Sequence, residues 1–177
     1  MTDLMIGKPD VIEYLPYYEK YVSLVPEGDI PRVLSGQIDD TLSLLRSIPE
    51  AQGGFRYAAG KWSIKEVLGH MIDSERVFAY RALRFARNDR TPLPGYEQDD
   101  YIRNASFDDY PLGELAEEFE SVRRASIFLF KHLKADAWMR KGLANDSETS
   151  VRALAYIIAG HELHHRGILQ DKYLPLL

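Results

Sequence analysis

Residues 150–174 constrain the fold more than any other stretch, because their helical pattern carries two histidines in the middle of its apolar face. On a wheel of about 100° per residue, His161 and His165 fall in line with Leu154 and Ile158. These are positions where a soluble helix normally places Leu or Ile. A buried imidazole needs a polar partner, and one metal ion could serve both rings. The spacing favours a metal site, and a pair of structural histidines is the alternative.

Composition limits the classes of protein to consider. The 177 residues are 45% hydrophobic and 28% charged, which predicts one globular domain spanning residues 1–177. The absence of cysteine excludes disulfides, thiolate metal sites, iron–sulfur clusters and a cysteine nucleophile. No signal peptide and no apolar run of membrane length is visible, so we expect a cytoplasmic protein without a membrane partner. A net charge of −5 without a basic tract argues against nucleic-acid binding.

Periodic apolar residues predict further helices at about residues 30–48, 63–88 and 112–133. Pro31 suits the first turn of the first of them. Ser63 and Glu66 have the spacing of a capping box at the start of the second. With the helix at 150–174 and no persuasive strand, the pattern predicts an all-α four-helix bundle.

The N-terminal segment is predicted to be an irregular arm. Prolines and glycines interrupt residues 1–28, although a short helix near residues 12–22 fits the pattern too. The arm is rich in tyrosine: Tyr14, Tyr17, Tyr18 and Tyr21. We expect it to pack across the domain or a subunit interface, with a mobile arm as the alternative.

Two connections carry their own signals. The long connection at residues 88–111 contains Asp99, Asp100 and Tyr101, which could reach over a site and bind substrate, and a solvated acidic loop is the alternative. Residues 134–149 form a turn region with a short helical turn near residues 135–139, which we expect Trp138 to anchor.

Residues His161 to His165 spell H-E-x-x-H, the pattern in which two histidines bind zinc and the glutamate is the general base. A peptidase of this kind needs a third protein ligand. The extended motif would require Gly and His at positions that hold Ile168 and Asp171, and no glutamate follows Glu162. The peptidase interpretation is therefore disfavoured.

A third ligand must come from another segment, and the candidates are His70, Asp73, Glu75, His132 and the Asp99/Asp100 pair. His70 lies off the main apolar stripe of its helix, so from the residues alone it is interpreted as a partly exposed helix residue. His132 is interpreted as structural. A haem site is disfavoured because axial ligands lie on opposite faces of the iron. A di-iron bundle would need a second Glu-x-x-His pair.

Three segments together resemble the DinB-like (YfiT-like) family of metalloenzymes: residues 61–78, 92–101 and 150–169. The specific features are the histidine that follows Trp62-Ser63 and Glu66, and the histidine cluster near the C-terminus. The resemblance implies a four-helix bundle in up-down-down-up order that forms a homodimer. It also implies nickel or zinc bound by three histidines, which map to His70, His161 and His165. It thereby overturns the interpretation of His70 as a non-ligand and leaves His164 beside the site or on the surface.

The resemblance also implies a function, because better-characterised relatives are transferases or isomerases that use bacillithiol, mycothiol or glutathione. We therefore expect a metal-dependent S-transferase whose partners are a small-molecule thiol and an electrophilic substrate. Glu162, beside a ligand, is the expected general base, and Asp100 and Tyr101 are the expected substrate-binding residues. The alternatives are a metal-dependent hydrolase that activates water, and a non-catalytic structural bundle.

Overall fold

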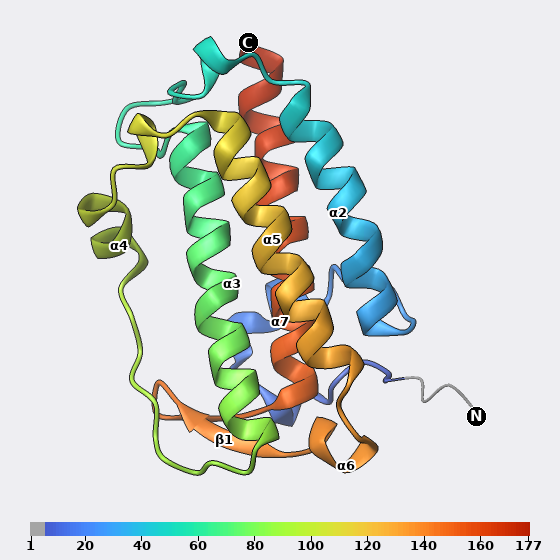
Figure 1. The fold of residues 1–177 in the computed structure, drawn as a ribbon. Helices are drawn as coiled ribbons and strands as arrows, with labels where there is room; N and C mark the ends of the chain where they lie inside the picture. The colour runs from blue at the N-terminus through green and yellow to red at the C-terminus, as the bar shows by residue number, and fades with distance from the viewer. Residues whose placement is uncertain (1–5) are drawn as a thin grey trace.

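Four long helices lie side by side in the computed structural model, which describes residues 6–177 (Figure 1). They are α2 (Ile30–Arg46), α3 (Ile64–Ala86), α5 (Leu112–Lys131) and α7 (Val151–Ile168). Helix α7 continues into a π-helical turn at Leu169–Tyr173 and a 3-10 turn at Leu174–Leu176. The predicted all-α four-helix bundle is confirmed.

The helices run in up-down-down-up order, as Figure 1 shows: α2 and α7 rise toward the end that carries the C-terminus, and α3 and α5 descend. Helices α2 and α3 each pack against both α5 and α7, so α2 lies diagonally opposite α3 and α5 lies diagonally opposite α7. This order arises because the connection between α3 and α5 returns along the outside of the bundle. That connection contains α4 (Gln98–Asn104) and a 3-10 turn at Phe107–Asp109.

Local capping fixes where the two helices that matter most for the site begin. At α3, the Ser63 side chain accepts from the Glu66 backbone N–H at 3.0 Å, and the Glu66 carboxylate accepts from the Ser63 N–H at 2.7 Å. The predicted capping box is therefore present. At α7, the Ser150 hydroxyl accepts from the Ala153 N–H at 3.0 Å.

The prediction of no strand is wrong, because β1 (Lys141–Ala144) and β2 (Ser147–Ser150) form an antiparallel hairpin. Asn145 and Asp146 connect the strands with φ of 52° and 57°. Asn and Asp tolerate this left-handed conformation, which a two-residue turn of type I′ requires at both positions. Just before the hairpin, α6 (Ala135–Trp138) confirms the expected helical turn, and the buried Trp138 ring stacks on Phe130 with centroids 5.5 Å apart.

Residues 1–5 of the predicted arm lie outside the described residues, and residues 6–28 are more regular than expected and pack on their own bundle. They contain 3-10 turns at Val11–Glu13 and Pro16–Tyr18 and the short helix α1 (Glu19–Val22), which lies against α7. The contact is close at Gly160, where an added Cβ would lie 2.0 Å from the carbonyl oxygen of Tyr21. A glycine is therefore needed for α1 to reach α7.

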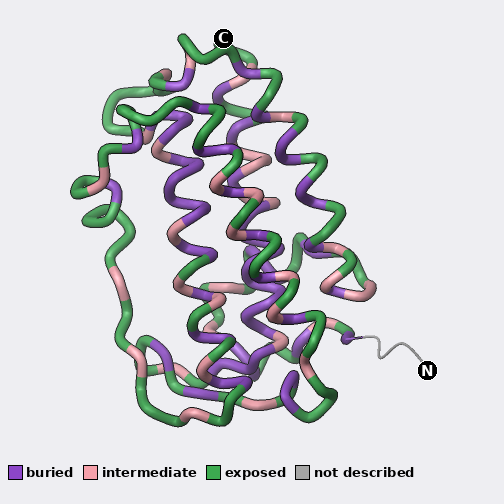
Figure 2. Tube along the Cα trace, in the orientation of Figure 1, coloured by how far each residue is buried: buried purple, intermediate pink, exposed green. Residues whose placement is uncertain are grey.

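The core among the described residues divides into two apolar clusters with a polar layer between them. Buried residues follow the inward sides of the long helices in Figure 2. On α5, for example, the buried Arg123 separates Phe119 of one cluster from Phe130 of the other. The same interruption occurs on all four long helices, with these buried polar residues: Gln37, Thr41, His70, Ser74, Glu75, Arg123, Ser126, His161, Glu162 and His165.

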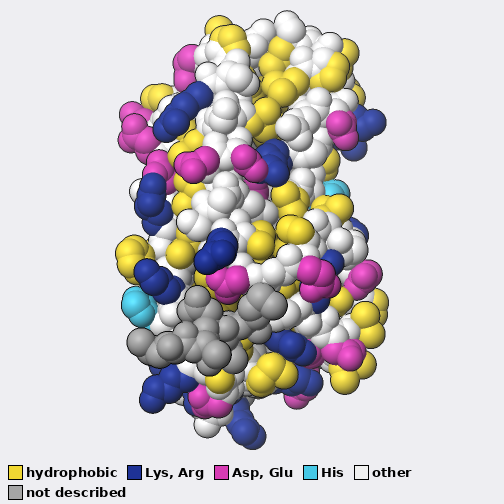
Figure 3. Space-filling view, turned by 90° about the vertical axis from the view of Figure 1, so that its right-hand side faces the viewer, with side chains coloured by type: hydrophobic (Ala, Val, Ile, Leu, Met, Phe, Trp, Pro, Cys, Tyr) yellow, Lys and Arg dark blue, Asp and Glu magenta, His cyan; other side chains and the backbone are white. Residues whose placement is uncertain are grey.

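The outer surface carries mixed charge. Figure 3 shows one face on which basic and acidic side chains are interspersed, with hydrophobic side chains visible between them from the upper to the lower end. Within the part of the chain that the structure describes, no helix has the length and apolar character needed to cross a membrane.

Replacing Gly160 by Ala should destabilise the protein by roughly 1–3 kcal/mol, because the new methyl group would overlap the Tyr21 carbonyl and force α1 away from α7. Urea unfolding measures the change. Gly167→Ala is the matched control, since a Cβ at this position of α7 meets nothing within 4 Å. Its better helix propensity should leave stability equal or slightly higher. Equal losses in both variants would contradict the close contact.

Candidate metal centre

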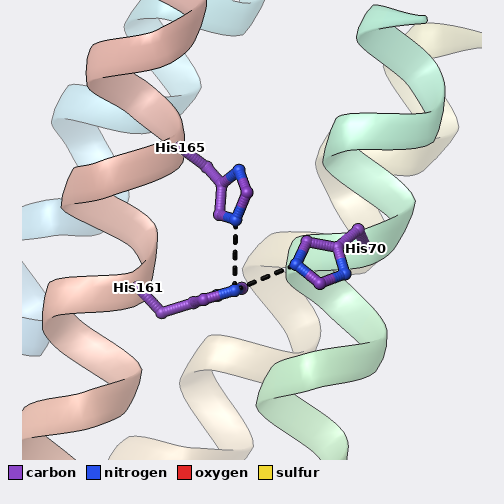
Figure 4. A group of neighbouring side chains, drawn as sticks. All are labelled: His70, His161 and His165. Atoms are coloured by element: carbon purple, nitrogen blue, oxygen red, sulfur yellow. Dashed lines mark hydrogen bonds between the residues drawn. The ribbon is translucent and has the colours of Figure 1, made fainter. Parts of the chain in front are cut away.

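Three histidine side chains converge between α3 and α7 (Figure 4). The Nε2 atom of His161 lies 3.0 Å from Nε2 of His70 and 3.2 Å from Nε2 of His165. The ligand nitrogens of all three lie within 4.8 Å of one another. His70 comes from α3, whereas His161 and His165 lie one turn apart on α7. The structure thus brings together the three histidines to which the family resemblance points.

The three rings are buried, with exposed fractions of 4% for His70, 6% for His161 and 8% for His165. Burial disfavours the charged imidazolium and lowers the pKa of His70 to about 4. Burial also lowers the pKa values of His161 and His165 well below the usual range, and repulsion from the neighbouring imidazoles adds to the effect. All three rings are therefore neutral at pH 7, so each has a free lone pair on one nitrogen.

Hydrogen bonds among the rings cannot satisfy all three Nε2 atoms at these distances. A neutral imidazole nitrogen carries either one hydrogen or one lone pair, so Nε2 of His161 cannot both donate to one neighbour and accept from the other. A cation placed among the three nitrogens would accept all three lone pairs. Two imidazole nitrogens on a tetrahedral zinc ion lie roughly 3.4 Å apart, close to the separations seen here. The residues present therefore fit a divalent metal bound by three histidines.

The other nitrogen of His70 has a partner suited to this role. Its Nδ1 lies 3.4 Å from the Ser74 hydroxyl, which shares a 2.8 Å hydrogen bond with the hydroxyl of Tyr96. An Nδ1–H donated to Ser74 leaves the Nε2 lone pair free to bind a metal. Aromatic rings pack the remaining sides: Trp62 lies 4.8 Å from His70 and Tyr21 lies 5.2 Å from His161, between centroids.

A pocket of about 420 Å³ opens beside His161. The arm, α3, the connection to α4, the hairpin turn and α7 all contribute to its walls. Five aromatic residues line it: Tyr17, Tyr18, Tyr21, Phe78 and Tyr96. Its polar lining comes from Glu97, Gln98, Asp99 and Asn145. A small molecule in this pocket would contact His161 directly.

Asp100 and Tyr101, the expected substrate-binding residues, do not line this pocket. Asp100 is exposed and pairs with Arg103 at 2.8 Å, while the Tyr101 ring packs against Tyr96 with centroids 5.0 Å apart. Asp99, from the same connection, does line the pocket. Substrate binding by Asp100 and Tyr101 stays a prediction.

Glu162 points into the bundle rather than toward the histidines. Its carboxylate accepts a hydrogen bond from Thr41 and pairs with Arg123 at 3.7 Å and Arg166 at 3.5 Å. In residues 6–177 it makes no hydrogen bond to a histidine ring. Its role as a general base stays a prediction that these contacts do not support.

The remaining ligand candidates lie elsewhere. Asp73 pairs with Arg76, Glu75 pairs with Arg123, and His132 is exposed at the end of α5. His164 is half-buried, with its ring 5.2 Å from Tyr21. The interpretation of His70 as partly exposed is wrong, because α3 buries a second face against α7.

Sequence reasoning missed Ser74, Tyr96 and Arg123. Ser74 could have been found, since it lies one turn after His70 on the same helical line. Tyr96 and Arg123 gave no local signal, because their partners are distant in the sequence.

Comparison with known proteins identifies the fold. The family model of the DinB superfamily matches residues 34–169. The chain is similar in structure to YfiT from Bacillus subtilis, described as a probable metal-dependent hydrolase with an unusual four-helix bundle topology. That match has 14% identity and a TM-score of 0.67, over 93% of this chain and 90% of YfiT. No curated protein sequence matches the chain.

Two further solved structures share the fold. A DinB-like protein, YjoA from Bacillus subtilis, has 19% identity and a TM-score of 0.59, over 80% of this chain and 86% of YjoA. A mycothiol-dependent maleylpyruvate isomerase has 14% identity and a TM-score of 0.60, over 86% of this chain and 60% of the isomerase.

The neutral histidines predict how the metal-free protein responds to acid. Since their pKa values in the folded state lie below the ordinary value of 6.5, their contribution to stability is complete above that pH and is lost as the pH falls toward about 4. Urea unfolding in the presence of chelator, at pH values from 7 to 4.5, measures the loss. A His161→Ala/His165→Ala variant should lose less stability over this range. An equal loss would contradict the burial of neutral rings.

Proposed function

The chain belongs to the DinB superfamily, and on that premise we propose that it is a metal-dependent enzyme that activates a low-molecular-weight thiol for S-transfer. The observation that carries the proposal is the convergence of three neutral, buried imidazoles at one point beside a pocket. His70, His161 and His165 would hold a divalent cation, nickel or zinc, which neutral imidazoles favour.

A divalent cation held by three neutral ligands would supply Lewis acidity and lower the pKa of a thiol or water that reached its open position. The chain's own residues would do the rest. Ser74 and Tyr96 would orient His70 through its Nδ1, and the aromatic side chains of the pocket would pack against the electrophile. The sulfur would bond to an electrophilic carbon while the thiol proton passes to solvent and any displaced group leaves with its electron pair.

The absence of a carboxylate from the histidine cluster favours a thiol over water as the nucleophile. Among the described residues, the group of potential ligands contains three imidazoles and no Asp or Glu. A thiol has a pKa of about 8.5 and needs little help to ionise, whereas water starts from about 15.7 and hydrolysis commonly uses a positioned acid–base group. The mycothiol-dependent isomerase of similar fold supports the same choice.

Metal-assisted hydrolysis is the second candidate. The fold is shared with YfiT, described as a probable metal-dependent hydrolase. Three histidines alone can support water activation, as in carbonic anhydrase. A hydrolase of this kind would act without a carboxylate base at the cluster.

Metal analysis of untagged protein tests the site. We expect stoichiometric nickel or zinc in the wild type and a loss of at least about tenfold in affinity for each of His70→Ala, His161→Ala and His165→Ala, because each change removes one ligand. His132→Ala and His164→Ala are matched controls that should retain the metal. Full retention in the triple variant, together with a melting temperature that chelator does not change, would favour a non-catalytic bundle.

The reacting nucleophile can be tested on cobalt-substituted protein. Addition of 2-mercaptoethanol should produce a sulfur-to-cobalt charge-transfer band in the wild type and none in His161→Ala. If no band forms and the loaded protein instead accelerates hydrolysis of p-nitrophenyl acetate, the hydrolase becomes the better conclusion.

Ser74→Ala should weaken metal binding by roughly 10- to 100-fold while the fold persists, because His70 loses the partner of its Nδ1. Competition with a chromogenic chelator measures the affinity. Ser121→Ala is the control, since the Ser121 hydroxyl only donates to the Glu117 carbonyl on the exposed face of α5. An unchanged affinity in Ser74→Ala would remove Ser74 from the site.

A further inference from the structure

Glu162 is a buried carboxylate that the proposed reaction does not use. Only 2% of its surface is exposed. One carboxylate oxygen accepts a hydrogen bond from the Thr41 hydroxyl of α2. The other lies 3.7 Å from Nη1 of Arg123 on α5. These contacts tie α7 to its neighbour α2 and, across the bundle, to α5.

Arg123 is the centre of this network and is fully buried. Its Nε donates to both carboxylate oxygens of Glu75, at 2.9 and 3.0 Å, and its Nη1 donates to the Gln37 side chain at 3.1 Å. Gln37 in turn donates to the carbonyl oxygen of Ala159, at 3.1 Å. The network therefore holds α7 twice, through Ala159 and through Glu162, on either side of His161.

The directions of the Glu162 and His161 side chains are linked because these residues are adjacent on one helix. Adjacent residues of a helix point about 100° apart, so the rotation that directs Glu162 toward Arg123 also directs His161 toward α3. His165 follows on the same line as His161. A rotation of α7 that broke the Glu162 contacts would swing both imidazoles away from His70.

Breaking the network would cost free energy. The contacts of Arg123 therefore favour one rotation of α7 about its axis. A buried guanidinium loses its hydration and depends on its carboxylate partners, so removing one of them leaves an uncompensated charge. Within residues 6–177, Nη2 of Arg123 and Oε2 of Glu162 have no hydrogen-bond partner. The attraction between these two groups is thus electrostatic, and Glu162 is the only carboxylate that α7 brings to Arg123 in that part of the chain.

We propose that Glu162 is a positioning residue that acts through Arg123, fixing the rotation of α7 and with it the direction in which His161 and His165 present their Nε2 atoms. The proposal rests on the proposed function, because it assigns the glutamate of H-E-x-x-H to holding the metal ligands in place. The alternative assigns that glutamate to proton transfer at the reacting atoms.

Metal affinity of Glu162→Gln tests the proposal without an activity assay. This variant keeps the size of the side chain and removes the charge that attracts Arg123. We expect zinc affinity, measured by chelator competition, to fall by roughly 10- to 100-fold. The absorption of the cobalt-loaded protein should also change, because the ligand directions change.

Glu13→Gln is the matched control. Glu13 is also a buried carboxylate paired with an arginine of α7, Arg152, but near the start of the helix. Arg152 lies about 13 Å along the helix from His161. This variant should lose stability and keep the zinc affinity of the wild type within about twofold, so it separates positioning from general destabilisation.

A double-mutant cycle tests whether Glu162 acts through Arg123. If it does, Arg123→Gln should weaken zinc binding as Glu162→Gln does, and the double variant should lose little more than the worse single variant. Should Arg123→Gln fail to fold, Arg123→Lys replaces it in the cycle, since it keeps the buried charge and removes the guanidinium that faces Glu162. Losses that simply add would overturn the route through Arg123.

The outcomes are distinct. If the wild type binds zinc and Glu162→Gln binds it equally well with an unchanged cobalt spectrum, the positioning role is overturned. A fall in kcat and a changed pH profile in that same variant would then establish the general-base role. If the wild type binds neither zinc nor nickel nor cobalt, the proposed function fails first.

Discussion

The charged layer buried across the middle of the bundle is the constraint on which the rest of the structure depends. Arg123 has no access to water, so it depends on Glu75, Gln37 and Glu162 around it, and the loss of any of them destabilises the fold. The hydrophobic effect that buries side chains above and below the layer is not directional, so it does not by itself select one rotation of each helix. The hydrogen bonds and charges of the layer are directional, and they therefore favour one rotation.

The helices could be predicted from the sequence because their signals are local. The capping box at Ser63 and the apolar periodicity of α2, α5 and α7 are properties of neighbouring residues. The hairpin was missed because each strand has only four residues, and its one signal was the Asn145-Asp146 pair. The order of the helices came from the family resemblance, since periodicity says nothing about which helices are neighbours.

The candidate site likewise combines features with a local sequence signal and features that depend on distant residues. The spacing of His161 and His165 could be read directly, because both lie on one helix. The burial of His70 could not, because it depends on α7 packing against the second face of α3. Glu162 was assigned to the reacting atoms from a motif, but its contacts are set by Thr41 and Arg123, which lie far away in the sequence.

The pocket and the histidines are built by different kinds of structure. The imidazoles stand on two long helices, whereas most of the pocket wall comes from the N-terminal arm, the connection before α4 and the hairpin turn. Connecting segments accept substitutions and insertions more readily than packed helices. Changes in Tyr17 or Asn145 can therefore alter the choice of bound molecule without touching the helices that carry the three imidazoles. One scaffold can in this way serve many substrates without being rebuilt.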